Sequence, residues 1–153
     1  MWLEKVKPRR IIIGLFYKNA VTNVNSVNEI LTSIEDVVGR TTLPIVVCGD
    51  FNQPGIDWEN LQAINVSHQE EHLGRFLATG LTQKVNFATY TRSDNTLDLV
   101  FESEDGTIVD IYPGKELSFS DHIPVHFSIS CSTRSLLNTH RNLDFDNMNV
   151  NLM

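Results

Sequence analysis

The sequence predicts a mixed α/β domain. Three patterns support this fold class: short apolar runs typical of buried strands, helical stretches between them, and a second half rich in strands. The order of the elements is strand, helix, strand, helix and then several strands, so we expect the second half to be antiparallel. A length of 153 residues fits one such domain.

The first half contains two predicted buried strands and an amphipathic helix. Residues 10–17 form a nearly continuous apolar run rich in β-branched and aromatic residues, which is typical of a buried strand. Between residues 24 and 38, apolar residues recur at steps of three and four, which places them on one helical face. Residues 43–48 form the second buried strand, which leads into a Gly-Asp-Phe-Asn motif at 49–52.

A polar stretch to about residue 67 separates this motif from a short predicted helix at 69–79. Its apolar residues Leu73, Phe76 and Leu77 are expected to point inward, and Gly80 is expected to end it.

Three further strands are predicted at residues 96–101, 107–112 and 122–130, with residues 104–106 as a hairpin turn. After Cys131 the composition shifts toward asparagine, with few large apolar groups. We therefore expect a domain over residues 1–131 and a linker or disordered tail over 132–153.

Composition and charge narrow the possible functions. The net charge of −7 argues against a protein that holds nucleic acid through its backbone charge alone. It does not argue against a metal-dependent nuclease, because such a site concentrates carboxylates and the ion reverses the local field. No apolar run is long enough for a membrane, and the N-terminus has no secretory pattern. With Cys48 expected as a buried free thiol, we predict a nuclear or cytoplasmic, intracellular protein.

Asp50 and Asn52 stand just past the end of a buried strand. If the chain stays extended there, residues two apart point the same way, and a carboxylate and an amide would face one site. Gly49 would let the backbone turn or approach a ligand closely. The same residue types also favour a plain turn, and this alternative stays open.

A second group of candidates comes from two later strands. Asp98 lies within an apolar run, where a carboxylate needs a partner, and it could orient an imidazole. His122 follows Asp121 at the start of another apolar run and suits acid/base chemistry or metal binding. The alternatives are an outward-facing Asp98 and a histidine that only begins a strand. The remaining histidines match no zinc-binding spacing: His68, His72, His126 and His140.

These motifs together resemble the endonuclease/exonuclease/phosphatase superfamily. The resemblance is carried by Gly-Asp-Phe-Asn at 49–52, Leu-Asp at 97–98 and Ser-Asp-His at 120–122, in that order. The Ile-Asp-Trp at 56–58 and the Thr-Arg at 91–92 are most similar to the endonuclease domains of non-LTR retrotransposons. The resemblance covers roughly residues 10–130. It implies a DNase I-like fold, in which two β-sheets pack as a sandwich flanked by helices.

The resemblance also implies a function, namely metal-dependent hydrolysis of phosphodiester bonds by direct attack of water. His122 would be the acid/base or transition-state residue, and Asp98 would orient it. Asp50 would position or deprotonate the attacking water. Tyr17 would hydrogen-bond the scissile phosphate.

By the same resemblance, Mg²⁺ or Mn²⁺ would be the cofactor. Asp121 would ligate the ion, with Asp50 and Asn52 as further candidate ligands, and Asn52 would hold the phosphate or a second metal. Hard oxygen ligands of this kind suit Mg²⁺. DNA would be the substrate, and the domain could once have been fused to a reverse transcriptase. No small-molecule cofactor and no membrane partner are expected.

The family usually begins with further strands and a metal-binding glutamate ahead of the strand at 10–17. We therefore expect this sequence to be the C-terminal two-thirds of such a domain, truncated at its N-terminus, with weak or no activity by itself. Two alternative functions remain: a phosphatase or lipid phosphodiesterase on the same fold, and an inactive remnant that acts as a binding module.

Overall fold

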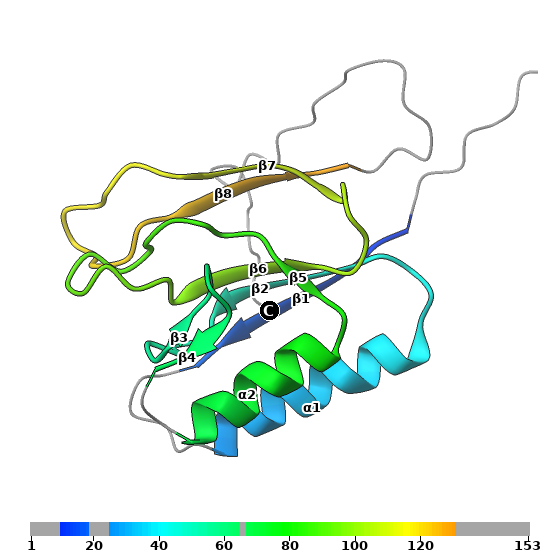
Figure 1. Ribbon diagram of the computed structural model, residues 1–153. Helices are drawn as coiled ribbons and strands as arrows, with labels where there is room; N and C mark the ends of the chain where they lie inside the picture. The colour runs from blue at the N-terminus through cyan, green and yellow to red at the C-terminus, as the bar shows by residue number, and fades with distance from the viewer. Residues whose placement is uncertain (1–9, 19–24, 65–66, 131–153) are drawn as a thin grey trace, which may run out of the picture.

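The computed structural model describes residues 10–18, 25–64 and 67–130, and it has three layers. A pair of helices covers one face of a four-stranded sheet, and a two-stranded sheet lies against the other face (Figure 1). A small hairpin of β3 (Ile56–Asp57) and β4 (Gln62–Ala63) lies beside one end of the larger sheet. The predicted mixed α/β class and the sandwich with flanking helices are both confirmed.

The larger sheet has the strand order β1-β2-β6-β5. These strands are β1 (Ile12–Tyr17), β2 (Ile45–Asp50), β6 (Asp98–Glu102) and β5 (Thr82–Gln83). β1 and β2 are parallel, and the other neighbours are antiparallel. The parallel pair is possible because a helix provides the crossover between its two strands. The two carboxylates of the site described below lie on the central strands β2 and β6.

Two helices cover the larger sheet: α1 (Asn25–Arg40) and α2 (Ser67–Ala78). The predicted apolar face of α1 packs inward, and Val27, Leu31 and Ile34 are fully buried. Together with α2 they enclose a core of stacked and edge-to-face aromatic rings. Its largest members are Phe51, Trp58, Phe76 and Phe101.

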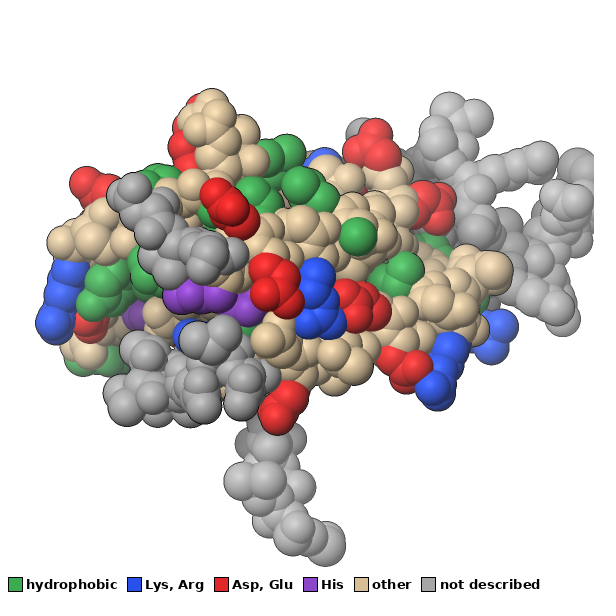
Figure 2. Space-filling model, turned by 60° about the horizontal axis from the view of Figure 1, so that its bottom comes forward, with side chains coloured by type: hydrophobic (Ala, Val, Ile, Leu, Met, Phe, Trp, Pro, Cys, Tyr) green, Lys and Arg blue, Asp and Glu red, His purple; other side chains and the backbone are tan. Residues whose placement is uncertain are grey.

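Arg75 of α2 joins the two helices by donating hydrogen bonds to Glu35, at 2.7 and 2.8 Å, and to Asn28 of α1. The surface formed by the helices carries mixed charges with acidic side chains in the majority, and it has no broad basic patch among the residues described (Figure 2). This face therefore offers little to a phosphate backbone.

The second sheet pairs β7 (Ile108–Pro113) with β8 (Val125–Ile129) in antiparallel fashion. A second apolar cluster lies between the two sheets. It contains Val46, Val85, Val100 and Ile108, with partly buried side chains of β7 and β8 against them. The sandwich brings the segment before β8 over the end of β6, and this placement forms the candidate site.

The strand and helix predictions are correct in kind, with shifted ends and three errors. The strand predicted as buried at 10–17 is instead an edge strand, and Ile13, Leu15 and Tyr17 on one of its faces are exposed. The helix predicted at 24–38 continues through Gly39 to Arg40. Leu77, expected to point inward, is 50% exposed, because Leu73 and Phe76 already fill the inward face of α2. Residues 104–106 do not close a hairpin, since β6 pairs with β2 and β5 whereas β7 pairs with β8. The chain instead passes there from one sheet to the other.

Gly80 ends α2 as predicted, with a φ of 72° that glycine adopts without strain. The strands β3, β4 and β5 were not predicted, because two-residue strands carry no periodic pattern. Cys48 is a half-buried free thiol. Among the described residues, no helix has the length and apolar character needed to cross a membrane. The predicted tail at 132–153 lies outside the described residues.

Candidate active site at the ends of β2 and β6

The site is built on two carboxylates that face each other across neighbouring strands. Asp50 is the last residue of β2 and Asp98 the first of β6, and the antiparallel register places them directly opposite each other. Residues in direct register lie on the same face of a sheet. Val46 and Val100 share this face and pack against the second sheet, so both carboxylates point toward the sandwich interior at its open end.

The third member of the site comes from the other sheet. His122 lies three residues before β8, and its Nδ1 is 2.7 Å from Oδ2 of Asp98. Its backbone is fixed by pairing with Tyr90 and by a hydrogen bond from its N–H to Ser120 Oγ at 3.1 Å. The rings of Tyr90 and His122 lie 5.2 Å apart. The sequence-based expectation that Asp98 reaches His122 is therefore confirmed.

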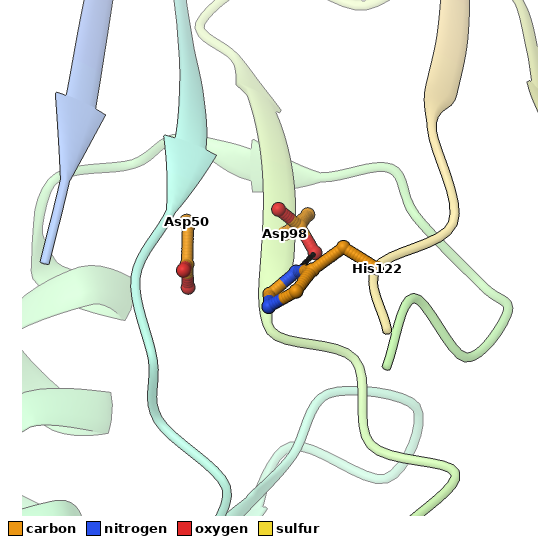
Figure 3. Close-up of side chains that lie close together, drawn as sticks. All are labelled: Asp50, Asp98 and His122. Carbon is orange, nitrogen blue, oxygen red and sulfur yellow. Dashed lines mark hydrogen bonds and ion pairs between the residues drawn. The ribbon is translucent and has the colours of Figure 1, made fainter. Parts of the chain in front are cut away.

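Asp50, Asp98 and His122 form one compact cluster, with a ligand atom from each lying within 4.8 Å of the others. Figure 3 shows the three side chains at the same opening beyond the ends of β2 and β6. Because the ionised Asp98 accepts from Nδ1, this nitrogen carries a hydrogen. The other ring nitrogen, Nε2, is then available to a substrate, an arrangement that suits proton transfer.

The charges at this site are unbalanced. Burial raises the pKa of Asp50 above its ordinary value, and the negative charge of Asp98 raises it further. The charges of His122 and Lys18 and a hydrogen bond from the Asn52 N–H act in the opposite direction without cancelling the rise. The ionised form of Asp50 therefore has too little positive charge near it, and a bound cation would supply that charge.

The residues present fit a hard divalent cation. Asp50 holds the Asn52 N–H through Oδ1 at 3.0 Å, and its second carboxylate oxygen is left for an ion. One oxygen of Asp98 is committed to His122, so Asp98 is at most a secondary ligand. Mg²⁺ commonly binds through one or two carboxylates and keeps several waters, which matches this small set of donors.

Tyr17 extends the same face by one strand. It is the register partner of Asp50 in β1, so Tyr17, Asp50 and Asp98 form a row across three neighbouring strands. Its side chain is 75% exposed and accessible to a large substrate. The structure thus places Tyr17 on the strand next to Asp50, and its hydrogen bond to a phosphate stays a prediction.

Asn52 departs from the expected geometry. Its φ is 46°, so the chain is not extended after Asp50, and the assumption that both side chains point the same way is wrong. The Asp50 side chain accepts the Asn52 N–H and closes a tight turn, which is the alternative that these residue types allowed. Lys18 donates to the Asn52 carbonyl at 3.4 Å from the neighbouring strand end.

Asp121 lies outside the cluster. Its carboxylate forms an ion pair with Arg92, with Oδ2 2.8 Å from Nε, and its backbone carbonyl accepts a hydrogen bond from the Thr91 N–H. Asp121 is not among the described side chains that cluster with His122, so its role as a metal ligand stays a prediction.

Sequence reasoning missed two residues at the site, Lys18 and Tyr90. Lys18 directly follows Tyr17, and its position next to a strand end was a usable signal. Tyr90 belongs to a turn whose pairing with the segment before β8 has no counterpart in the sequence pattern. Only the fold brings Tyr90 against the imidazole.

Comparisons with known proteins identify the family and the fold of the chain. The family model for "Endonuclease-reverse transcriptase" matches residues 11–126. Among solved structures, the chain is similar to the endonuclease domain of TRAS1, a telomere-specific non-LTR retrotransposon, with 21% sequence identity and a TM-score of 0.55. The match covers 76% of this chain and 55% of that one, so the chain spans little more than half of this relative. The fold is the DNase I-like sandwich. The comparison with curated proteins gives no match.

Proposed function

Because the chain belongs to the endonuclease–reverse transcriptase family, we propose that it hydrolyses phosphodiester bonds of DNA by metal-assisted attack of water. The observation that carries the proposal is the Asp98–His122 hydrogen bond next to Asp50 at the open end of the sandwich. An oriented imidazole beside a carboxylate short of positive charge suits acid/base chemistry on an anionic ester.

In this mechanism His122 and Asp98 act as a pair. Asp98 fixes the imidazole with Nδ1 protonated and stabilises the positive charge that appears when Nε2 also holds a proton. Attack of water at phosphorus forms one P–O bond and breaks another, and the leaving alkoxide takes up a proton. Nε2 of His122 is the ring nitrogen placed to exchange that proton.

Asp50 lies beside the Asp98–His122 pair, where it would position the attacking water or accept its proton. Tyr17, Lys18 and the Asn52 side chain lie around the same strand ends and would hold the phosphate. Mg²⁺ or Mn²⁺, bound chiefly by Asp50, would neutralise charge on the phosphoryl oxygens. Asp121 could join as a ligand only after leaving Arg92.

A plasmid-nicking assay with Mg²⁺ or Mn²⁺ tests the proposal. Because slow turnover is expected, the full chain is used in excess over supercoiled plasmid. We expect metal-dependent nicking that is lost in His122→Ala and strongly reduced in Asp98→Asn. His126→Ala is the matched control, since His126 is exposed on β8 and stacks on Tyr112 away from the cluster.

Nicking that survives His122→Ala would contradict the proposed role of the pair, and absence of nicking by the parent chain would contradict the activity. A phosphomonoester and a sphingolipid phosphodiester serve as comparison substrates, because phosphatases and lipid phosphodiesterases share the fold. Preference for either of them would replace DNA as the substrate.

We propose residues 1–131 as the catalytic unit and 132–153 as a linker, once joined to a reverse transcriptase. A nuclear or cytoplasmic location, suggested by the free thiol of Cys48, would give access to DNA.

A further inference from the structure

A buried polar contact lies directly beneath the turn that follows Asp50. Gln53 is 4% exposed and His72 of α2 is 1% exposed, and they meet through Gln53 Oε1 and His72 Nδ1 at 3.0 Å. The amide nitrogen of Gln53 donates to the backbone carbonyls of Phe51 and Asn52, at 3.4 and 3.2 Å. One side chain thus links α2 to two successive peptide groups of the turn.

The hydrogen-bond directions follow from the partners. Carbonyl oxygens only accept, so the Gln53 nitrogen must face Phe51 and Asn52 and its oxygen must face His72. His72 must then carry a hydrogen on Nδ1, and burial lowers its pKa, which favours the neutral ring. His72 Nε2 is left as a buried acceptor without a partner among the described residues.

This arrangement is costly as mere packing. An unpaired buried acceptor such as Nε2 costs about 1–3 kcal/mol, which an apolar side chain at position 72 would avoid. The Nδ1–H is therefore the feature of His72 that a nonpolar residue could not supply. This N–H acts on the turn through its hydrogen bond to Gln53, and not through direct contact with a substrate.

The turn is the part of the site that most needs support. Asn52 holds a φ of 46°, which residues other than glycine adopt at some cost. Its N–H binds Asp50 Oδ1 at 3.0 Å, so the conformation of Asn52 and the orientation of the Asp50 carboxylate are tied together. Fixing the Asn52 carbonyl from below fixes this pair.

We propose that Gln53 and His72 are positioning residues that hold the Asp50–Asn52 turn in the geometry required for the cation and the phosphate. This role rests on the proposed function. An unbroken chain of hydrogen bonds connects His72 to the site: His72 to Gln53, Gln53 to the Asn52 carbonyl, and the Asn52 N–H to Asp50.

A matched pair of substitutions at position 72 separates positioning from packing. The amide nitrogen of asparagine is attached at the same point as Nδ1 of histidine, so His72→Asn keeps a donor for Gln53. The amide nitrogen of glutamine lies one bond farther out, where Nε2 lies in histidine, so His72→Gln loses that donor. Gln53→Leu removes the link from the other side at similar volume.

Two readouts on the full chain test the proposal, and neither requires turnover. Mn²⁺ affinity, measured by water-proton relaxation with the metal alone, should fall roughly 10-fold or more in His72→Gln and Gln53→Leu. It should stay within about twofold of the parent value in His72→Asn. Hydrogen exchange of the Asn52 amide, which bonds to Asp50, should speed up in the same two variants only.

The outcomes distinguish this proposal from the proposed function. Equal Mn²⁺ affinity and equal Asn52 exchange in all variants, with only thermal stability reduced, would overturn the positioning role. A parent chain that binds no Mn²⁺ would overturn the metal-dependent function, and the exchange pattern would still decide whether His72 holds the turn. Ring ¹⁵N shifts that show Nε2 protonated in the parent would also overturn the proposal.

Discussion

Removing Lys84 should lower stability strongly, because it would leave the buried charge of Glu102 unpaired at the junction of the two sheets. Glu102 is 1% exposed, and its two oxygens lie 2.7 Å from the Ile108 N–H and 2.8 Å from Lys84 Nζ. Ile108 begins β7, so this carboxylate ties β6 to the sheet that carries His122. Lys84→Met keeps most of the aliphatic stem and leaves the charge of Glu102 unpaired.

Removing one partner of a buried ion pair costs about 3–5 kcal/mol. Because the Lys84 side chain is 26% exposed, water can reach the site, and we expect the lower end, about 3 kcal/mol. Glu102→Leu removes the charge but leaves the Ile108 N–H unpaired, at about 1–3 kcal/mol. The double variant should therefore be much less destabilised than the sum of the two single changes.

Urea unfolding of the parent, both single variants and the double variant gives the coupling free energy. We expect roughly 3 kcal/mol, because the double variant has no unpaired charge, and this lies at the upper end of the range observed for residues that share a network. A coupling below about 0.5 kcal/mol, which is usual for exposed ion pairs, would refute the view that this charge is held by Lys84 in a buried setting. Asp105, 99% exposed and 3.6 Å from Lys84 Nζ, should contribute little.

Three further predictions concern the strands and the site. Gly49→Ala should destabilise the chain by more than the ~1–3 kcal/mol typical of a strained backbone, since φ is 144° and the new Cβ would lie 1.8 Å from the Phe16 carbonyl oxygen. Gly39→Ala, with nothing within 4 Å in α1, should instead stabilise by roughly 0.5–1 kcal/mol in the same unfolding assay. Asp50→Asn should raise the melting temperature at pH 7. The raised pKa of Asp50 means that its ionisation lowers stability as pH rises from the ordinary value of 3.8 through the folded value, so the gain should vanish at pH 3.

The buried strands and helix faces were predictable because burial leaves a periodic record in the sequence. The runs that became β2 and β6 are apolar because both faces of these central strands are covered, and α1 repeats apolar residues at helical steps. The run of β1 is just as apolar, yet β1 lies at the sheet edge with Ile13 and Leu15 exposed, so the run alone did not reveal its exposure. Leu77 shows the limit of this reasoning. Periodicity says which residues can share a face, but the width of the covered face depends on what packs against it.

The Asp98–His122 contact was also predictable, since a carboxylate in an apolar strand needs a partner and the chain offered an imidazole at another strand start. The placement of Asp121 was not. Asp121 and His122 are adjacent in the chain, and the sequence does not say which of their side chains enters the site. In the structure Asp121 forms an ion pair with Arg92. The two residues are distant in the sequence, so this contact could not be predicted from it.

The turn at Asn52 illustrates a different limit, because both interpretations of the same residues contained part of the answer. Asp50 closes a turn through its side chain, as the plain-turn interpretation predicts. It nevertheless remains in the cluster with Asp98 and His122. Tight turns use one carboxylate oxygen and leave the other unoccupied. A residue can therefore hold the backbone and serve the site at once.

The opposition of Asp50 and Asp98 is hard to explain by stability alone. Like charges directly across neighbouring strands are destabilising, and here both carboxylates lie partly buried with one imidazole between them. An asparagine at either position could keep a hydrogen bond without the repulsion. Instead, the Gln53–His72 contact and the Lys18 ammonium hold the turn at Asp50 in place. Such an arrangement is expected where the negative charge itself is needed, as it is for binding a cation beside an anionic ester.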